Sequence, residues 1–226
     1  MSARILIQFP TRQRPKKFIQ VAKKYIDLLS DKDNWVMNVS CDEDDFSMNN
    51  IAMMKRVFGL ASEDKVVLNF NANKNKIEAV NANIADFDFD IVLLASDDMI
   101  PKERGYDNII RKHFATYFPN FDGVVHYDDG HQHDRLNTLS ILGKAYYDRF
   151  GYIYHPSYVS LWADNEFDEI SRILGKHQYI EQLIIRHEHP ATNINVINDD
   201  LYIKNNAYEA ADRANYNQRK AMKFNL

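Results

Sequence analysis

Residues 90–101 read DIVLLASDDMIP and carry the clearest structural signal in the chain. Its first half is a short run rich in Ile, Val and Leu, which predicts a buried strand over residues 90–95. Its second half places Ser96, Asp97 and Asp98 directly after that strand. Polar groups in this position lie at the edge of a sheet, where α/β proteins bind their ligands.

The segments before this stretch repeat the same order of strand and helix. Short apolar or alternating runs predict three further strands, over residues 3–9, 35–40 and 65–70. Apolar residues at helical spacing predict helices over residues 15–29, 48–58 and 75–85. This alternation predicts an α/β fold with a parallel sheet flanked by helices.

The chain after residue 101 has a less regular pattern. We expect a strand within residues 121–127, a helix over 165–175, a strand over 180–187 and a helix in the last 20 residues. The 226 residues suffice for one substantial domain and are few for two. Residues 1–226 are therefore expected to form a single domain, with residues 1–101 and 102–226 as its two halves.

Composition excludes several classes of protein. The net charge of −4 argues against the basic face typical of DNA-binding domains. The single cysteine, Cys41, allows no internal disulfide and favours a reducing compartment. No segment of the sequence approaches the roughly 18 consecutive apolar residues that a membrane helix needs. The apolar run at the N-terminus is too short for a signal peptide. We therefore expect a cytoplasmic protein without a membrane span.

Polar side chains gather where each of the four predicted strands ends. These groups are Thr11, Arg12 and Arg14; Asp42, Glu43, Asp44 and Asp45; Asn69, Asn71 and Asn73; and Ser96, Asp97 and Asp98. The carboxyl ends of parallel strands meet at one edge of a sheet, so these four groups are expected to line one ligand site.

Each group has a functional and a purely structural interpretation. Asp97 and Asp98 offer hard oxygens for Mg²⁺ or Mn²⁺, although Asp97 can instead cap a following helix. Arg12 and Arg14 suit phosphate, although arginines in a turn are commonly on the surface. An acid in the run 42–45 can accept the imide N–H of uracil, or can simply begin a helix.

The order of four motifs carries a resemblance to a known family. The segments ILIQFPTRQRP, VSCDEDD, NKNKIEAVNANI and DIVLLASDDMIP resemble, across the first 101 residues, the family 2 glycosyltransferases of GT-A fold. The resemblance implies a Rossmann-like, mostly parallel central sheet in a single domain. It also implies a nucleotide-sugar site made by Pro10, Thr11, Arg12, Arg14, Asp42, Asp44, Lys76, Asn81 and Asp97. The motif is SDD rather than a strict DXD, so Asp98 is the preferred metal ligand.

The resemblance extends in outline to two motifs of the second half. SLWADNEF (160–167) resembles the segment that supplies the catalytic base of inverting members, either Asp164 or Glu166. We favour Asp164, which can equally be the N-cap of the predicted helix. IIRHEHP (184–190) resembles the segment in which a histidine completes the metal site, here His187 or His189. Imidazole ligands favour Mn²⁺ over Mg²⁺.

The segment HYDDGHQHD (126–134) is rich in groups that bind metals or sugars. Three interpretations stay open for it: a second metal site, an acceptor-side loop of the kind the family uses to bind sugar hydroxyls, or an ordinary polar loop.

These observations predict a metal-dependent glycosyltransferase that uses a nucleotide-diphosphate sugar, with inversion, and Mn²⁺ or Mg²⁺ as cofactor. UDP is favoured over GDP as the family's commonest donor carrier. The acceptor is open between a saccharide, a small molecule and modified DNA, and the acidic net charge weighs against DNA. An inactive nucleotide-sugar or glycan-binding module is one alternative. A sugar-phosphate nucleotidyltransferase is another, disfavoured because residues 1–58 lack the glycines of its phosphate loop.

Overall fold

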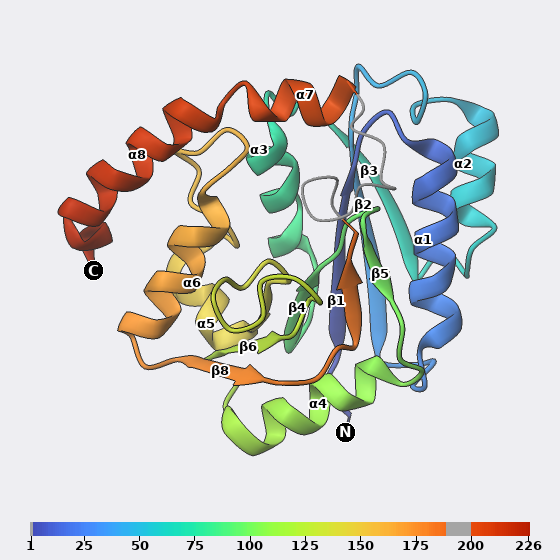
Figure 1. Cartoon of the computed structure of the whole chain (residues 1–226). Coiled ribbons are helices and arrows are strands. Elements are labelled where there is room, and N and C mark those ends of the chain that lie inside the picture. Colours follow the sequence, from blue (N-terminus) through green and yellow to red (C-terminus); the bar gives the residue numbers. More distant parts are fainter. Residues whose placement is uncertain (1, 189–199) are drawn as a thin grey trace.

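The structure is a computed structural model that describes residues 2–188 and 200–226. These residues form a seven-stranded sheet with the order β3-β2-β1-β4-β7-β6-β8, and a two-stranded sheet of β5 and β9 (Figure 1). The strands are β1 (Ile5–Thr11), β2 (Trp35–Asp42), β3 (Val66–Asn71), β4 (Ile91–Leu94), β5 (Met99–Pro101), β6 (Val124–Tyr127), β7 (Ile141–Gly143), β8 (His177–Ile180) and β9 (Ile185–His187). Both halves of the chain thus contribute strands to one sheet.

Parallel pairing brings the strand ends of the first half together. Strand β1 lies between β2 and β4, with Ile5 opposite both Trp35 and Ile91. Strand β3 pairs parallel to β2, β7 is antiparallel to β4 and β6, and β8 is parallel to β6. The large sheet is therefore mostly parallel, as the alternation of strands and helices predicted.

Helices cover both faces of the large sheet. They are α1 (Pro15–Leu28), α2 (Ile51–Phe58), α3 (Lys76–Asn81), α4 (Tyr106–Tyr117), α5 (Lys144–Phe150), α6 (Ala163–Ile173), α7 (Asp200–Asn206) and α8 (Glu209–Ala221), with 3₁₀ turns at Ile84–Asp86 and Lys223–Asn225. Helices α1 and α2 lie on one side of the sheet in Figure 1, and α3, α5 and α6 lie on the other. Alternation along β1 explains the two layers, because Ile5, Ile7 and Phe9 join one core and Leu6 joins the other.

Several predicted boundaries differ from the structure for local reasons. Helix α2 begins at Ile51 because the Asn50 side chain accepts the amide of Met53 as its N-cap. The predicted helix 75–85 divides into α3 and a 3₁₀ turn, separated by Asn83 in a left-handed conformation. The N-cap of α6 is Trp162, so the interpretation of Asp164 as that cap is wrong. The expected strand 180–187 is shorter, with only Ile185–His187 forming β9.

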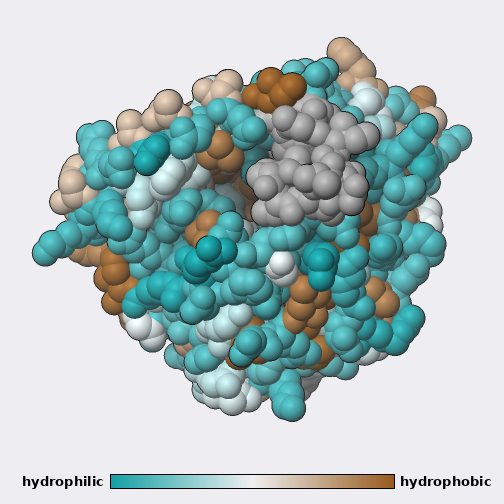
Figure 2. All heavy atoms as spheres, in the orientation of Figure 1, coloured by the Kyte–Doolittle hydropathy of each residue, from teal (hydrophilic) through white to brown (hydrophobic). Residues whose placement is uncertain are grey.

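The last 20 residues contain the predicted helix, as α8, and a further helix, α7, comes before it. Helix α7 crosses the carboxyl edge of the sheet, and α8 continues beside α6 (Figure 1). The face seen in Figure 2 is mostly hydrophilic outside the residues drawn in grey, with hydrophobic residues only as scattered spots. Among the residues described, no helix has both the length and the apolar character to cross a bilayer.

Candidate functional site

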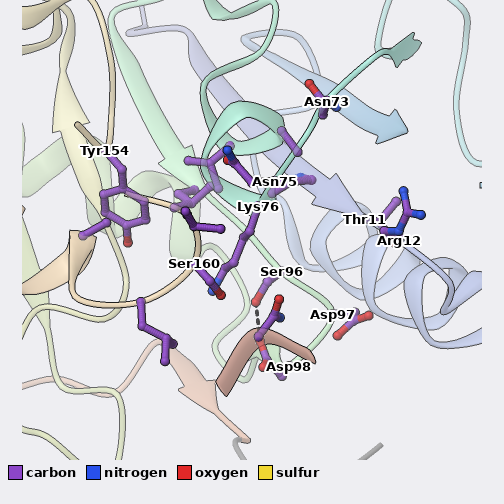
Figure 3. Close-up of a pocket in the computed structure, with 18 of the residues that line it drawn as sticks. Thr11, Arg12, Asn73, Asn75, Lys76, Ser96, Asp97, Asp98, Tyr154 and Ser160 are labelled. Carbon is purple, nitrogen blue, oxygen red and sulfur yellow. Dashed lines mark hydrogen bonds between the residues drawn. The ribbon is translucent and has the colours of Figure 1, made fainter. Parts of the chain in front are cut away.

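A cavity of about 340 Å³ opens at the carboxyl edge of the large sheet (Figure 3). This volume lies in the range of small-ligand sites. It is lined from the first half by the ends of β1, β2 and β4 and by α3, and from the second half by residues 159–164, by β9 and by α7. The residues predicted from the sequence that line it are Pro10, Thr11, Arg12, Arg14, Asp42, Asp44, Lys76, Asp97, Asp98, Asp164 and His187. The structure thus brings most of the predicted site residues to one place.

The small sheet places His187 beside Asp98. Met99 of β5 lies opposite His187 of β9, and the amide of Glu188 donates to the carbonyl of Asp98 at 2.7 Å. The His187 Nε2 lies 3.8 Å from Oδ2 of Asp98. Ser96 donates its hydroxyl to the other oxygen, Oδ1, of Asp98. A carboxylate and an imidazole that face each other at this separation can share a divalent cation.

Asp129 lies behind His187 and was not singled out as a site residue from the sequence. Its Oδ2 is 3.8 Å from Nδ1 of His187 and accepts the hydroxyl of Thr138 at 2.6 Å. Burial alone lowers the pKa of His187, but the carboxylates of Asp129 and Asp98 raise it to about 9. A carboxylate that holds the far nitrogen of a metal-binding histidine is a common outer-shell arrangement. Only its place in the acidic segment 126–134 pointed to Asp129.

Asp97 lies on the other side of the motif, next to two cations. Arg14 donates to its Oδ1 at 3.0 Å, and the Lys17 Nζ is 3.5 Å from the same oxygen. Burial raises the pKa of Asp97, and Arg14 and Lys17 oppose that rise. Strand β5 follows Asp97, so its alternative interpretation as a helix cap is wrong.

Arg12 joins the ends of β1 and β2 at the rim of the cavity. It donates to Asp42 and, through both terminal nitrogens, to Asp44. Asn73, beyond β3, donates to the second oxygen of Asp42 at 2.8 Å. Three strand ends are therefore tied into one polar wall, in which Arg12 is already paired with carboxylates.

Asp45 holds the two loops of this wall in position. It is buried, and its Oδ2 accepts the amide of Gln13 at 2.7 Å. Its Oδ1 accepts both the amide and the hydroxyl of Ser47. Gln13 has a φ of 60°, a left-handed conformation that this hydrogen bond stabilises. Asp45 is thus a positioning residue for the loop that carries Thr11, Arg12 and Arg14.

A buried polar row positions α3, which carries Lys76. Gln8 donates its amide to the carbonyls of Val80 and Ala82, both at 3.0 Å, and Asn38 donates to Gln8 at 2.7 Å. These bonds satisfy carbonyls at the C-terminal end of α3, which have no donor within the helix itself. Lys76, at the first turn of α3, points into the cavity in Figure 3.

Asn81 occupies a different place from the one predicted. Within the described chain it does not line the cavity. Its side chain accepts the amides of Ile153 and Tyr154 and donates to the carbonyl of Tyr154 at 2.7 Å. Tyr154 does line the cavity, and its hydroxyl lies 3.0 Å from that of Ser140. Asn81 therefore positions Tyr154 in the cavity wall and does not itself face the cavity among the residues that the structure describes.

The two candidate bases have separate environments although they lie two positions apart. Asp164 faces the cavity from the first turn of α6, half-buried, and burial raises its pKa while Lys76 opposes the rise. Glu166 is 2% exposed and lies away from the cavity as far as the structure describes it. Its oxygens accept from Arg219 at 2.7 and 2.8 Å and from the Tyr158 hydroxyl at 2.7 Å. Of the two candidate bases, only Asp164 lines the cavity among the described residues, and the oxygens of Glu166 are occupied by Arg219 and Tyr158.

Two hydroxyl groups in the cavity wall make no hydrogen bond with the described residues. Thr11 Oγ1 and Ser160 Oγ are buried and have no hydrogen-bond partner among the described residues. Buried hydroxyls are ordinarily satisfied, so a cavity lined by two that are not is suited to a polar ligand. Sequence reasoning identified Thr11 but not Ser160, because serines are too common to single out.

The side chains of segment 126–134 lie in several different environments. Asp129 joins the cavity network, whereas His133 is exposed and lies 3.0 Å from Asp128. His126 is buried on β6 and does not line the cavity as far as the structure describes it. His189, the second predicted metal-ligating histidine, lies outside the described residues.

Comparison with known proteins identifies the fold. No model of a protein family matches the chain, and no curated protein matches it. Among solved structures, the mannosyltransferase PcManGT from Pyrobaculum calidifontis, in complex with GDP-Man and Mn²⁺, matches with 15% identity and a TM-score of 0.61. That match covers 81% of this chain and 55% of the other.

TarS of S. aureus matches with 10% identity and a TM-score of 0.62, over 83% of this chain and 37% of that one. Its fragment 1–349 in complex with UDP-GlcNAc matches with 10% identity and a TM-score of 0.61, over 81% and 58%. The chain has a GT-A-type fold. The prediction of this fold is confirmed, and the chain spans less than two thirds of the length of these GT-A proteins.

Proposed function

We propose that the protein is a metal-dependent glycosyltransferase that moves a sugar from a nucleotide diphosphate to an acceptor hydroxyl. The convergence of strand-end polar groups, an acid–imidazole pair and an isolated acid on one cavity carries this proposal. The GT-A fold adds support, because PcManGT and TarS are glycosyltransferases. UDP-sugars are the first donors to test, with GDP-sugars second.

The proposed donor side is the wall made by the ends of β1, β2 and β4. Thr11 offers an unpaired hydroxyl to the nucleoside, and the Arg12–Asp42–Asp44 network gives that wall its shape. Asp98 and His187 would hold the cation, with Mn²⁺ favoured by the imidazole, and Asp129 would orient His187. The cation would neutralise charge on the departing diphosphate. Asp97 stays paired with Arg14 next to it.

The proposed acceptor side lies across the cavity, at residues 159–164. Asp164 would take the proton of the attacking hydroxyl on one carboxylate oxygen, and the hydroxyl oxygen would form the new bond to the anomeric carbon. Attack from the side opposite the diphosphate inverts the configuration. A carboxyl whose pKa is raised by burial is a better proton acceptor than an ordinary aspartate. Ser160 would bind an acceptor or sugar hydroxyl.

A panel of nucleotides with and without Mn²⁺ tests the donor site by thermal shift. A ligand that binds only the folded state raises the melting temperature. We expect UDP or GDP with Mn²⁺ to stabilise the wild type but not Asp98→Ala. The control is Asp88→Asn, because Asp88 is exposed on the loop before β4. If no nucleotide stabilises the protein under any metal condition, the proposal is wrong.

Slow hydrolysis of the donor separates an enzyme from a binding module. An active transferase releases UDP or GDP from its donor sugar without acceptor, whereas an inactive module binds the donor and leaves it intact. We expect release that depends on Mn²⁺ and is lost in Asp98→Ala. Donor binding without any release by the wild type would favour the binding module.

A further inference from the structure

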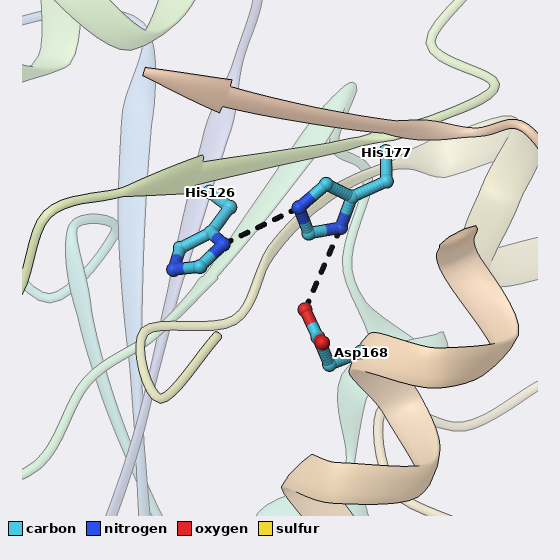
Figure 4. A group of neighbouring side chains, drawn as sticks. All are labelled: His126, Asp168 and His177. Carbon is cyan, nitrogen blue, oxygen red and sulfur yellow. Dashed lines mark hydrogen bonds and ion pairs between the residues drawn. The ribbon is translucent and has the colours of Figure 1, made fainter. Parts of the chain in front are cut away.

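A second group of metal-ligating side chains lies apart from the cavity, between α6 and the edge of the large sheet. His126 comes from β6, His177 from β8 and Asp168 from α6 (Figure 4). His126 is 1% exposed, Asp168 is 6% exposed, and the side chain of His177 is also 6% exposed. Within the described residues none of the three lines the cavity.

The separations between these side chains are longer than good hydrogen bonds. His126 Nδ1 lies 3.3 Å from His177 Nε2, and His177 Nδ1 lies 3.6 Å from Asp168 Oδ1. One ligand atom of each residue can be chosen so that all three atoms lie within 4.8 Å of one another. Ligand atoms around a tetrahedral Zn²⁺ are about 3.3–3.5 Å apart, so small side-chain rotations suffice to close such a site.

We propose that His126, His177 and Asp168 form a zinc site that joins α6 to strands β6 and β8. Two imidazoles and one carboxylate are a donor set that suits Zn²⁺ and other late transition metals better than Mg²⁺. This inference does not depend on the proposed sugar transfer.

The surroundings of the three residues support metal ligation. Arg172 donates to Asp168 Oδ2 at 2.8 Å, whereas the buried Oδ1 accepts no hydrogen bond from the described residues. The Ser171 hydroxyl lies 2.9 Å from His177 Nδ1, which leaves Nε2, the nitrogen facing His126, as the ligand. Metal-binding side chains are commonly oriented in this way by partners on their other polar atom. An unsatisfied carboxylate oxygen buried beside two imidazoles is costly unless a cation binds it.

The site would fix the helix that carries the candidate base. Asp168 lies one turn after Asp164 on α6, so a cation held by Asp168 and two strands clamps that helix to the sheet. Arg172 extends the clamp, because its Nη2 donates to the carbonyl of Asp134 at 2.6 Å. Segment 126–134 would thus be connected to the site at both ends, directly through His126 and through Arg172 at Asp134.

Metal analysis of the full chain tests the proposal with Zn²⁺ alone, without nucleotide. Protein stripped with a chelator is titrated with Zn²⁺ in competition with a chromogenic chelator, and Co²⁺ is used as a visible probe of coordination. We expect one high-affinity Zn²⁺ per chain and an intense Co²⁺ absorbance of the tetrahedral type. Asp168→Asn and His177→Ala should each weaken zinc binding at least 100-fold, and Ser171→Ala about 10-fold.

Two matched variants distinguish this site from others on the chain. Asp98→Ala removes the cavity ligand, and the double variant His131→Ala/His133→Ala removes two histidines that are not buried. Both should keep one zinc and the Co²⁺ spectrum. Thermal unfolding without nucleotide and far-UV circular dichroism check that Asp168→Asn, the isosteric variant, is folded. Zinc binding that is absent from the wild type, unchanged in folded Asp168→Asn, or lost in the histidine double variant overturns the proposal.

Discussion

Charged side chains gather in two regions of the molecule, and they are used in opposite ways. Around the cavity, Asp98 and Asp164 face an open space that a ligand can enter. Between α6 and α8, Glu166 is buried against Arg219 and Tyr158, and its oxygens are already occupied. Asp164 and Glu166 lie only two positions apart on α6. A carboxylate that faces the cavity is therefore open to a ligand, whereas one enclosed by a buried ion pair is not.

Helix α8 accounts for this difference, because it supplies the partners of the second region. Its Asp212 is 2% exposed and accepts the backbone amides of Val159, Ser160 and Leu161, at 2.8–3.0 Å. The same helix supplies Arg219 to Glu166. Helix α8 therefore fixes the loop that places Ser160 in the cavity wall. The contacts between α6 and α8 thus position residues of the site without lining the cavity themselves.

Replacing Asp164 by Asn should have the largest effect on turnover. Loss of a general base typically costs about 10²–10⁴-fold in rate, and we expect a fall in kcat of that size with little change in the KM for the donor. A base must be deprotonated, so wild-type turnover should fall as the pH drops through the raised pKa of Asp164. That acid limb should lie above the ordinary aspartate value of about 3.9. Wild-type kinetics in Asp164→Asn would contradict the assignment.

Replacing Glu166 by Gln should instead reduce stability. The change leaves the partly buried Arg219 without its counter-charge. Breaking a fully buried pair costs about 3–5 kcal/mol in the free energy of unfolding, and we expect a loss at or below the lower end of that range. Urea denaturation measures this loss, and turnover per folded molecule should stay near the wild-type value. A stable Glu166→Gln protein with strongly reduced kcat would reverse the roles given to Asp164 and Glu166.

Asp212→Asn should have a smaller effect that reaches the site. Hydrogen bonds to a charged group contribute about 1.5–3 kcal/mol each, but an amide oxygen still accepts some of the three backbone donors. We expect a loss of about 2 kcal/mol in the free energy of unfolding. The KM for the acceptor should also rise, because Ser160 is released. Asp64→Asn is the control, because Asp64 is exposed. An equal loss in the free energy of unfolding for this control would show that the effect comes from removing a negative charge and not from the hydrogen bonds of Asp212.

The two unpaired hydroxyls should give the smallest effects and separate the two sides of the cavity. Neither Thr11→Val nor Ser160→Ala breaks a hydrogen bond that the described residues make, so both should keep wild-type stability. A lost hydrogen bond to a ligand contributes about 0.5–1.5 kcal/mol, or a factor of roughly 2–10. We expect this factor in the donor KM for Thr11→Val and in the acceptor KM for Ser160→Ala. If each variant raised the donor KM and the acceptor KM by the same factor, the assignment of Thr11 to the donor and Ser160 to the acceptor would be contradicted.

Much of what residues 1–101 contribute to the cavity could be predicted from the sequence for a clear reason. Parallel strands deliver their carboxyl ends to one edge, so residues that follow Phe9, Cys41 and Ala95 had to meet there. The prediction for Asn81 was wrong because its side chain binds the backbone of residues 153 and 154, more than 70 positions away. Similarly, the sequence left Glu166 open as a second candidate beside the favoured Asp164, because the contacts of Glu166 with α8 follow from no local pattern.

The sequence by itself determined the α/β alternation, the mostly parallel sheet and the position of Asp97 and Asp98, because these depend on local periodicity and on strand polarity. Only the tertiary structure decided that Asp129 lies behind His187, that Asp164 rather than Glu166 faces the cavity, and that His126 meets His177 and Asp168. The physical reason is that these contacts join segments tens of residues apart. Their partners are selected by packing between helices and strands, which no local pattern records.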